Sequence, residues 1–156
     1  MSDQEYVFDT KHDRYPLAVH VFLVQHGKIL LMRRAGSGYA DGLLGLPAGH
    51  VDLGETPTAC AVREVAEELG ITLAPAALRP GGTMFRLSQE PRVDIFFTAR
   101  AWTGTPEIRE PNKCTELAWA DPHQLPDDTL EFIGPAWEDA QNGHVLREFG
   151  FTPSPA

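Results

Sequence analysis

The sequence predicts an α/β fold, an α/β/α sandwich in which a mixed β-sheet lies between helices. Segments typical of strands alternate with segments of helical periodicity, in the order strand, strand, helix, strands, helix. The chain has 156 residues, 42% of them hydrophobic and 22% charged, which suits one globular domain with a substantial core. We expect that domain at 17–150, between an N-terminal arm at 1–16 and a flexible tail at 151–156.

The composition excludes several classes of partner. The net charge of −9 argues against a general binder of nucleic-acid polymers or of anionic membranes, which would carry a basic face. A nucleotide substrate stays open, because bound Mg²⁺ can supply positive charge locally. Cys60 and Cys114 lack metal-ligand spacing, and no apolar run reaches membrane-spanning length. We therefore expect a cytoplasmic protein with reduced thiols.

The first strands form a hairpin. Residues 17–25 are almost continuously apolar, which predicts a strand buried on both faces. His26-Gly27 makes the turn, and residues 28–33 form the antiparallel return strand. His20 lies inside the apolar run. It is either a hydrogen-bonded core histidine or a residue that lines a pocket for a base.

A glycine-rich loop at 35–44 leads from this hairpin to a short strand at 46–51, and it lacks the residue order of a phosphate-binding loop. Arg33 and Arg34 immediately precede the loop. They serve either surface solubility or contact with substrate phosphates, which the guanidinium fork suits geometrically. We treat both as candidate substrate-binding residues.

An amphipathic helix is predicted at 57–69. Thr56 is the expected N-cap, Pro57 fits the first helical position, and Gly70 is a natural left-handed stop. Residues at helical spacing predict the buried stripe, which comprises Thr58, Ala61, Val62, Val65, Ala66 and Leu69.

The exposed face of this helix concentrates negative charge. Glu64, Glu67 and Glu68 stand at i, i+3 and i+4, so their side chains converge and repel one another. Arg63 is the only basic residue within the helix to offset them. The pattern indicates either a solvated acidic face or a site for a divalent cation, since hard cations such as Mg²⁺ take oxygen ligands.

The second half of the chain supplies further strands and a closing helix. Strands are predicted at 82–87, 92–102 and 116–121. We favour Asp127-Asp128 as the cap of the last helix over recognition of a purine amine. That helix is predicted at 132–149, interrupted near Gly134-Pro135 and near Asn142-Gly143.

The stretch from 49 to 71 has the residue order of the Nudix box. The defining positions are Gly49, Glu55, Arg63, Glu64, Val65, Glu67, Glu68, Gly70 and Ile71. The chain therefore resembles the Nudix hydrolases, and this resemblance implies a Nudix-type α/β/α sandwich and hydrolysis of phosphoanhydride bonds. It departs from the family pattern at Leu44 and Ala48, where relatives commonly carry Trp and Gly. Neither position is charged.

The resemblance also implies roles for individual residues. Mg²⁺, with Mn²⁺ as the alternative, would be held by the Gly49 carbonyl and the carboxylates of Glu64, Glu67 and Glu68. Arg63 would orient the glutamates, Glu55 would brace the loop against the helix, and Gly70 would be structural. The catalytic base would be one of the box glutamates or Glu110, the loop acid that we prefer over Glu116.

A second segment narrows the resemblance. Glu110-Pro-Asn-Lys-Cys114 and the later Leu125-Pro126 are similar to segments of MutT-like diphosphatases. This implies hydrolysis of a nucleoside or deoxynucleoside triphosphate, an oxidised purine nucleotide included, to the monophosphate and pyrophosphate. The alternatives are a hydrolase of a nucleoside diphosphate linked to another group, such as ADP-ribose, and a nucleotide sensor without turnover. We expect a monomer or a homodimer.

Overall fold

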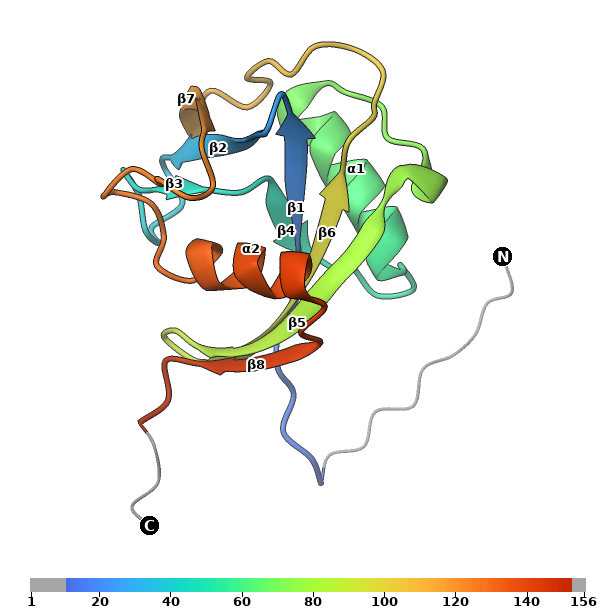
Figure 1. Ribbon diagram of the computed structural model, residues 1–156. Coiled ribbons are helices and arrows are strands. Elements are labelled where there is room, and N and C mark those ends of the chain that lie inside the picture. Colours follow the sequence, from blue (N-terminus) through green and yellow to red (C-terminus); the bar gives the residue numbers. More distant parts are fainter. Residues whose placement is uncertain (1–10, 153–156) are drawn as a thin grey trace.

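Figure 1 shows the computed structural model of the protein, which describes residues 11–152. Residues 1–10 of the predicted arm and 153–156 of the predicted tail lie outside the described residues. None of the helices described is long and apolar enough to cross a membrane.

In the described part of the chain, eight strands form one mixed sheet. They are β1 (Leu17–Gln25), β2 (Lys28–Arg34), β3 (Leu44–Gly45), β4 (Ala48–His50), β5 (Arg79–Leu87), β6 (Pro91–Ala99), β7 (Cys114–Ala120) and β8 (Leu146–Phe149). The main order is β3-β2-β1-β6-β5-β8, while β4 pairs with β1 and β7 pairs with β2. The pairs β1–β6 and β5–β8 are parallel and the others are antiparallel. The mixed sheet is confirmed.

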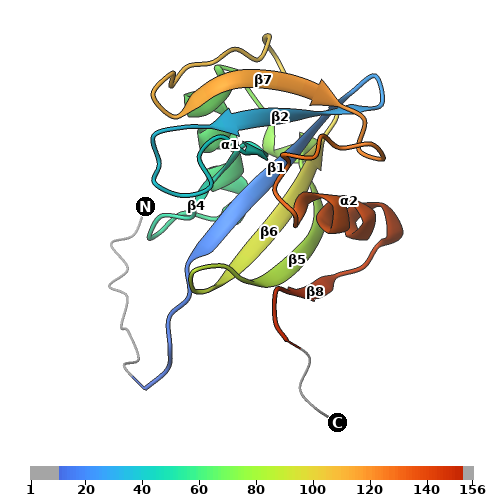
Figure 2. The ribbon, with the colours of Figure 1, turned by 90° about the vertical axis from the view of Figure 1, so that its left-hand side faces the viewer.

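Two helices cover opposite faces of this sheet, as Figures 1 and 2 show. Helix α1 (Pro57–Leu69) packs with Val19, Val21 and Leu23 of β1 in one core cluster. Helix α2 (Ile133–Asn142) packs with Phe22 of β1 in a second cluster. Alternate residues of β1 therefore serve the two cores, as expected for a strand buried on both faces. The predicted α/β/α sandwich is confirmed.

Helix α1 begins and ends where the sequence predicts. The Thr56 hydroxyl accepts a hydrogen bond from the Ala59 amide at 3.1 Å, and Gly70 ends the helix with φ of 70°. The predicted stripe is wrong at Ala66, which is exposed, whereas Cys60 is buried. The stripe is turned toward Cys60 because that side of the helix packs on the end of β4, where the thiol lies 3.3 Å from the His50 carbonyl.

The C-terminal part departs most from prediction. A single helix over 132–149 is wrong, because Gly143 ends α2 with φ of 69° and the chain then forms β8 beside β5. Gly134-Pro135 does not interrupt α2, since it falls in the first turn, where a missing N–H has no partner to lose. The predicted cap at Asp127-Asp128 is also wrong, because α2 starts later, with Phe132 at its N-cap position.

Strand boundaries shift by a few residues. Strand β5 starts at Arg79 rather than at 82, because a register irregularity between Pro80 and Thr83 lets the strand continue through the two glycines. Strand β6 stops at Ala99, before the predicted end at 102. Strand β7 starts at Cys114, so the preceding polar loop is shorter than predicted.

Candidate active site

A cavity of about 630 Å³ opens beside β4 and is lined by residues from both faces of the sheet. One group of lining residues is acidic and comprises Glu64, Glu67 and Glu68 of α1 and Glu110 of the loop before β7. A second group is basic and aromatic and comprises His20, Arg86, Arg92 and Phe132. The cavity therefore brings the predicted box glutamates and Glu110 together with residues from β1, β5 and β6.

Strand β4 holds Gly49 between β1 and α1. Gly49 pairs with Val19, and a Cβ atom at Gly49 would clash with the Glu64 carboxyl group. A side chain at this position would therefore displace the Glu64 carboxyl group from its place beside β4. The Gly49 carbonyl oxygen also lies 3.7 Å from the Cys60 sulfur. Glycine is thus needed here for close approach rather than for an unusual φ angle.

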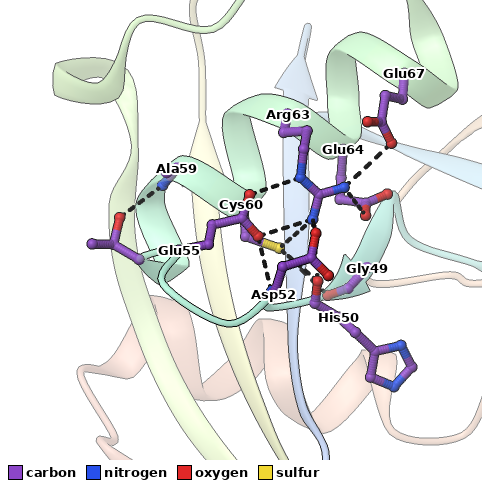
Figure 3. Close-up of polar contacts among 10 residues, drawn as sticks. Gly49, His50, Asp52, Glu55, Ala59, Cys60, Arg63, Glu64 and Glu67 are labelled. Carbon is purple, nitrogen blue, oxygen red and sulfur yellow. Dashed lines mark hydrogen bonds and ion pairs between the residues drawn. The ribbon is translucent and has the colours of Figure 1, made fainter. Parts of the chain in front are cut away.

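Arg63 is the centre of the polar contacts within the box (Figure 3). Its Nε and Nη2 atoms donate to the two Glu55 carboxylate oxygens at 2.7 and 2.9 Å. Its Nη1 atom donates to Glu64 at 2.8 Å and to Glu67 at 3.3 Å, while Nη2 also donates to the His50 carbonyl at 3.2 Å. One guanidinium therefore connects the loop, β4 and the acidic face of α1.

Glu55 lies where the loop before α1 meets Arg63, a placement compatible with the bracing role that the resemblance implies. Besides Arg63, it accepts a hydrogen bond from the Asp52 amide at 3.1 Å, which closes the loop before α1. The Arg63 hydrogen bonds and then the Asp52 amide lower the pKa of Glu55 to about 2. Glu55 is therefore held as a carboxylate by Arg63 and is not among the residues that line the cavity.

Glu64 and Glu68 lie in contact, with a hydrogen bond between their carboxyl groups. Burial, followed by the adjacent Glu64 carboxylate, raises the pKa of Glu68 to about 9, although the Ala48 amide opposes this by donating a hydrogen bond to Glu68. Two carboxyl groups in contact cannot both ionise cheaply unless a proton or a cation lies between them. A divalent cation bound between the two carboxylates would relieve their repulsion.

The residues fit a hard divalent cation in donor type, since carboxylates and a backbone carbonyl are the oxygen ligands that Mg²⁺ prefers. Within residues 11–152, however, no three acidic, histidine or cysteine side chains already converge as a metal cluster. Glu67 is 52% exposed and is hydrogen-bonded to Arg63. Its carboxylate would have to turn to join Glu64 and Glu68.

The two candidate loop acids differ in position. Glu110 lines the cavity, and its charge contributes to the raised pKa of Glu68. Glu116 is half exposed on β7, does not line the cavity and accepts a hydrogen bond from Arg33 at 2.8 Å. This placement is compatible with the preference for Glu110, whose role stays a prediction.

The two candidate arginines also differ in their position relative to the cavity. Arg33 is held outside the cavity by Glu116 and by Asp128, which accepts a hydrogen bond from Nη1 at 2.7 Å. Asp128 therefore pairs with Arg33 instead of capping α2. Arg34 lines the cavity, where it donates to the Tyr39 carbonyl at 3.1 Å. The structure therefore leaves Arg34 in reach of a ligand and engages Arg33 in β2–β7 packing.

A buried network that the sequence reasoning missed lies on the α2 side of the sheet. Asp94 is fully buried, and it accepts from His20 Nε2 at 2.9 Å and from Arg86 Nε at 2.6 Å. Arg92 Nε lies 3.3 Å from the same carboxylate. His20 is thus a buried, hydrogen-bonded histidine, as one of the two alternatives predicts, and it also lines the cavity. One sign of this network was available in the sequence, since Asp94 is a lone acid between apolar residues of a strand.

Burial and hydrogen bonding fix the charges of this network. Burial, together with the charges of Arg86 and Arg92, lowers the pKa of His20 although Asp94 opposes this, so the ring is neutral at pH 7. Burial alone would raise the pKa of Asp94, but the hydrogen bonds from His20 and Arg86 hold it well below its usual range. The network therefore contains one carboxylate and the two arginines Arg86 and Arg92, with a net positive charge.

The chain matches the family model of the NUDIX domain over residues 14–140. It is similar to 8-oxo-dGTP diphosphatase of Escherichia coli, with 38% identity over 56 residues, 36% of this chain and 43% of that enzyme. A second 8-oxo-dGTP diphosphatase, from Haemophilus influenzae, is 32% identical over 70% of this chain and 77% of that enzyme. The matched part thus spans less than half of the first relative.

Two further likenesses complete the comparison. Isopentenyl-diphosphate Delta-isomerase of Cereibacter sphaeroides is 31% identical over 127 residues, 73% of this chain and 68% of that enzyme. Among solved structures, the MutT NUDIX hydrolase from Burkholderia pseudomallei superposes with a TM-score of 0.74 and 28% identity, covering 81% of this chain and 98% of that one.

Proposed function

This chain belongs to the NUDIX domain family, and from that premise we propose that it hydrolyses a nucleoside or deoxynucleoside triphosphate to the monophosphate and pyrophosphate. The family and the MutT-like relatives support hydrolysis of phosphoanhydride bonds. An oxidised purine nucleotide is among the candidate substrates, since two relatives bear the name 8-oxo-dGTP diphosphatase. The active unit would be the single domain at 17–150, as a monomer or a homodimer.

The observation that carries this proposal is the contact of Glu64 with Glu68 beside Gly49. These residues, with Glu67, would hold Mg²⁺ or Mn²⁺. When bound, such an ion neutralises phosphate oxygens and lowers the pKa of a coordinated water.

The protein's own residues supply orientation and proton transfer. Arg63 fixes Glu64 through a charge-assisted hydrogen bond and anchors the helix to the loop through Glu55. Glu110 or a box glutamate would accept the proton of the attacking water. Arg34 and Lys113, which also line the cavity, would attract the anionic substrate.

A second candidate function is isomerisation of an organic diphosphate, because the isomerase relative aligns with most of this chain. It would use the same diphosphate-binding groups without cutting the phosphoanhydride bond. A hydrolase of ADP-ribose-like compounds and a sensor without turnover are the remaining alternatives.

The test is a product-resolved screen with purified protein. The substrates are the common nucleoside triphosphates, 8-oxo-dGTP, ADP-ribose and isopentenyl diphosphate, each with Mg²⁺ or with EDTA. We expect pyrophosphate from a triphosphate with Mg²⁺ and none with EDTA. Isomer formation without phosphate release would establish the second candidate instead, and nucleotide hydrolysis that persists in EDTA would contradict a metal-dependent site. Glu138→Gln, on the exposed face of α2, is the matched control and should retain full activity.

A further inference from the structure

We propose that Arg86 is a specificity-determining residue, which recognises a hydrogen-bond-accepting oxygen of the substrate remote from the scissile phosphates. This inference rests on the proposed function, because Arg86 lines the same cavity as the box glutamates. It concerns a different part of that cavity, formed by β1, β5, β6 and Phe132.

Arg86 is fixed in position before any ligand binds. Arg86 is only 5% exposed, and its Nε atom donates to Asp94 at 2.6 Å. Its Nη1 atom donates to the Tyr39 hydroxyl at 3.3 Å, and its guanidinium carbon lies 4.0 Å from the centre of the Phe132 ring. A guanidinium held by two hydrogen bonds and an aromatic ring loses little freedom on binding a ligand.

Donors remain on this guanidinium. Arginine has five N–H donors, and the contacts to Asp94 and Tyr39 occupy one on Nε and one on Nη1. Asp94 cannot take more of them readily, because its oxygens already face His20 and Arg92 as well. Arg86 therefore presents N–H groups at the cavity wall that call for acceptors, and a ligand amine placed there would face donors instead.

The charges around Arg86 also favour a ligand oxygen that accepts hydrogen bonds. Around Arg86, the described network sets Asp94 against two arginines, while His20 adds no positive charge. A buried positive group is stabilised by an oxygen acceptor, neutral or anionic. The keto oxygen of a nucleobase and the oxygen of a second phosphate share this chemistry.

A purely structural ion pair is the competing explanation. It would require Arg86 and Asp94 only for stability, and buried pairs of that kind are often replaceable by apolar residues. It does not explain why the pair lines the cavity, nor why Tyr39, from the loop after β2, meets Arg86 there together with Ser88. The two explanations differ in what they predict for ligand preference.

The experiment measures binding in EDTA, so that it does not depend on turnover. Inosine and adenosine 5′-monophosphates, which differ by a keto oxygen and an amine, form the first pair. Adenosine 3′,5′-bisphosphate and adenosine 5′-monophosphate form the second. We expect wild type to favour the oxygen-bearing member of at least one pair by about tenfold, the discrimination of one good arginine contact. Which pair responds identifies the source of the oxygen.

Variants assign that preference to Arg86. Arg86→Met should remove it, and Arg86→Lys should reduce it, because an ammonium lacks the planar fork. Arg79→Met, at an exposed position of the same strand, should leave it unchanged. If Arg86→Met fails to fold, which its melting curve will show, Tyr39→Phe tests the same site by removing the hydroxyl that positions Arg86.

The outcomes separate this inference from the proposed function. An Arg86-dependent preference in a protein that cuts no triphosphate would support the inference and contradict the proposed hydrolysis. Triphosphate hydrolysis with equal binding within both pairs, with no binding of any of the ligands, or with a preference that survives in the Arg86 variants would overturn the inference and leave the hydrolase intact.

Discussion

The two parts of the cavity are built in opposite ways. Most of the acidic part comes from one continuous stretch, in which Arg63 binds Glu55, eight positions before it, and the adjacent Glu64. Only Glu110 joins this part from another segment, the loop before β7. The basic part is assembled from distant segments, with His20 and Asp94 separated by 74 positions in the chain. A sequence motif can therefore be recognised where one loop and one helix supply the site. No such motif exists where only the pairing of strands brings the residues together.

The two parts also use arginine differently. Arg63 is partly exposed and bound by several carboxylates, so its donors are largely committed to holding acids in place. Arg86 is buried against a single carboxylate that it shares. We infer that the first arginine organises the chemistry, whereas the second is available to a ligand.

The largest expected effect comes from breaking the acidic part. Glu67→Gln or Glu68→Gln removes a charged oxygen ligand and should lower turnover by about 100- to 1,000-fold while leaving the melting temperature nearly unchanged. Steady-state kinetics with the substrate found in the screen would measure this. Near-normal turnover in both variants would remove the metal-ligand assignment.

The next effect concerns stability in the basic part. Asp94→Asn leaves Arg86 and Arg92 without their shared carboxylate and should destabilise the fold by about 3 kcal/mol, measured by denaturant unfolding. Asp139→Asn is the matched control, since Asp139 holds the more exposed Arg147 by two hydrogen bonds and should cost less. Equal losses in both variants would show that Asp94 is no special anchor.

A smaller effect distinguishes the two loop acids. Glu110→Ala should reduce turnover about 10- to 100-fold, because Glu110 lines the cavity together with Glu64 and Glu68. Glu116→Ala, which only releases Arg33, should reduce it less. The reverse order in a parallel assay would mean that the catalytic contribution comes from the β7 acid.

The last comparison is of pH dependence, which should have opposite signs in the two parts of the cavity. In metal-free protein, Glu68 binds its proton more tightly when folded, so its contribution to stability is present below pH 4.5 and is lost as pH rises toward about 9. Asp94 has a lowered pKa, so its contribution is present above pH 3.8 and is lost on acidification. His20 adds to the acid loss, because its pKa is also lowered.

Thermal melting from pH 3 to pH 9 in EDTA, and again with Mg²⁺, would measure this. Mg²⁺ should remove the alkaline loss, because it replaces the proton shared by the glutamates, and should leave the acid loss unchanged. In Glu68→Gln the alkaline loss should be absent. An alkaline loss that persists in this variant would have to arise from another group.

Much of the fold was predictable because local rules decided it. Thr56, Pro57 and Gly70 set the bounds of α1, and continuous apolar character marked β1 as a central strand. The segment after Gly143 was not predictable from periodicity, since only its pairing with β5 makes it a strand. Asp128 was misassigned for a related reason, because its partner Arg33 lies 95 positions away.

The residues of the candidate site were also predictable only where local sequence order reveals them. Box residues were found by their order, and the structure groups Gly49, Glu64, Glu67 and Glu68 around one cavity. Arg34 and Glu110 were included on weaker grounds and also reach the cavity, whereas Arg33 does not. Asp94 gave only a weak local sign, a lone acid between apolar residues of a strand, and Arg86 gave none, because it is one charged residue within an ordinary strand pattern.

The antiparallel hairpin of β5 and β6 carries Arg86, Arg92 and Asp94 on one compact unit, closed by a short turn in which the Ser88 amide donates to the Glu90 carbonyl at 3.2 Å. None of the box residues lies on it. For protein engineering, the cavity-facing side chains of this hairpin are therefore separable from the box: exchanging Arg86, Arg92 and Asp94 together should change which compounds the cavity accepts, while Phe97 and Ala99 of β6 are kept because they pack in the core under α1.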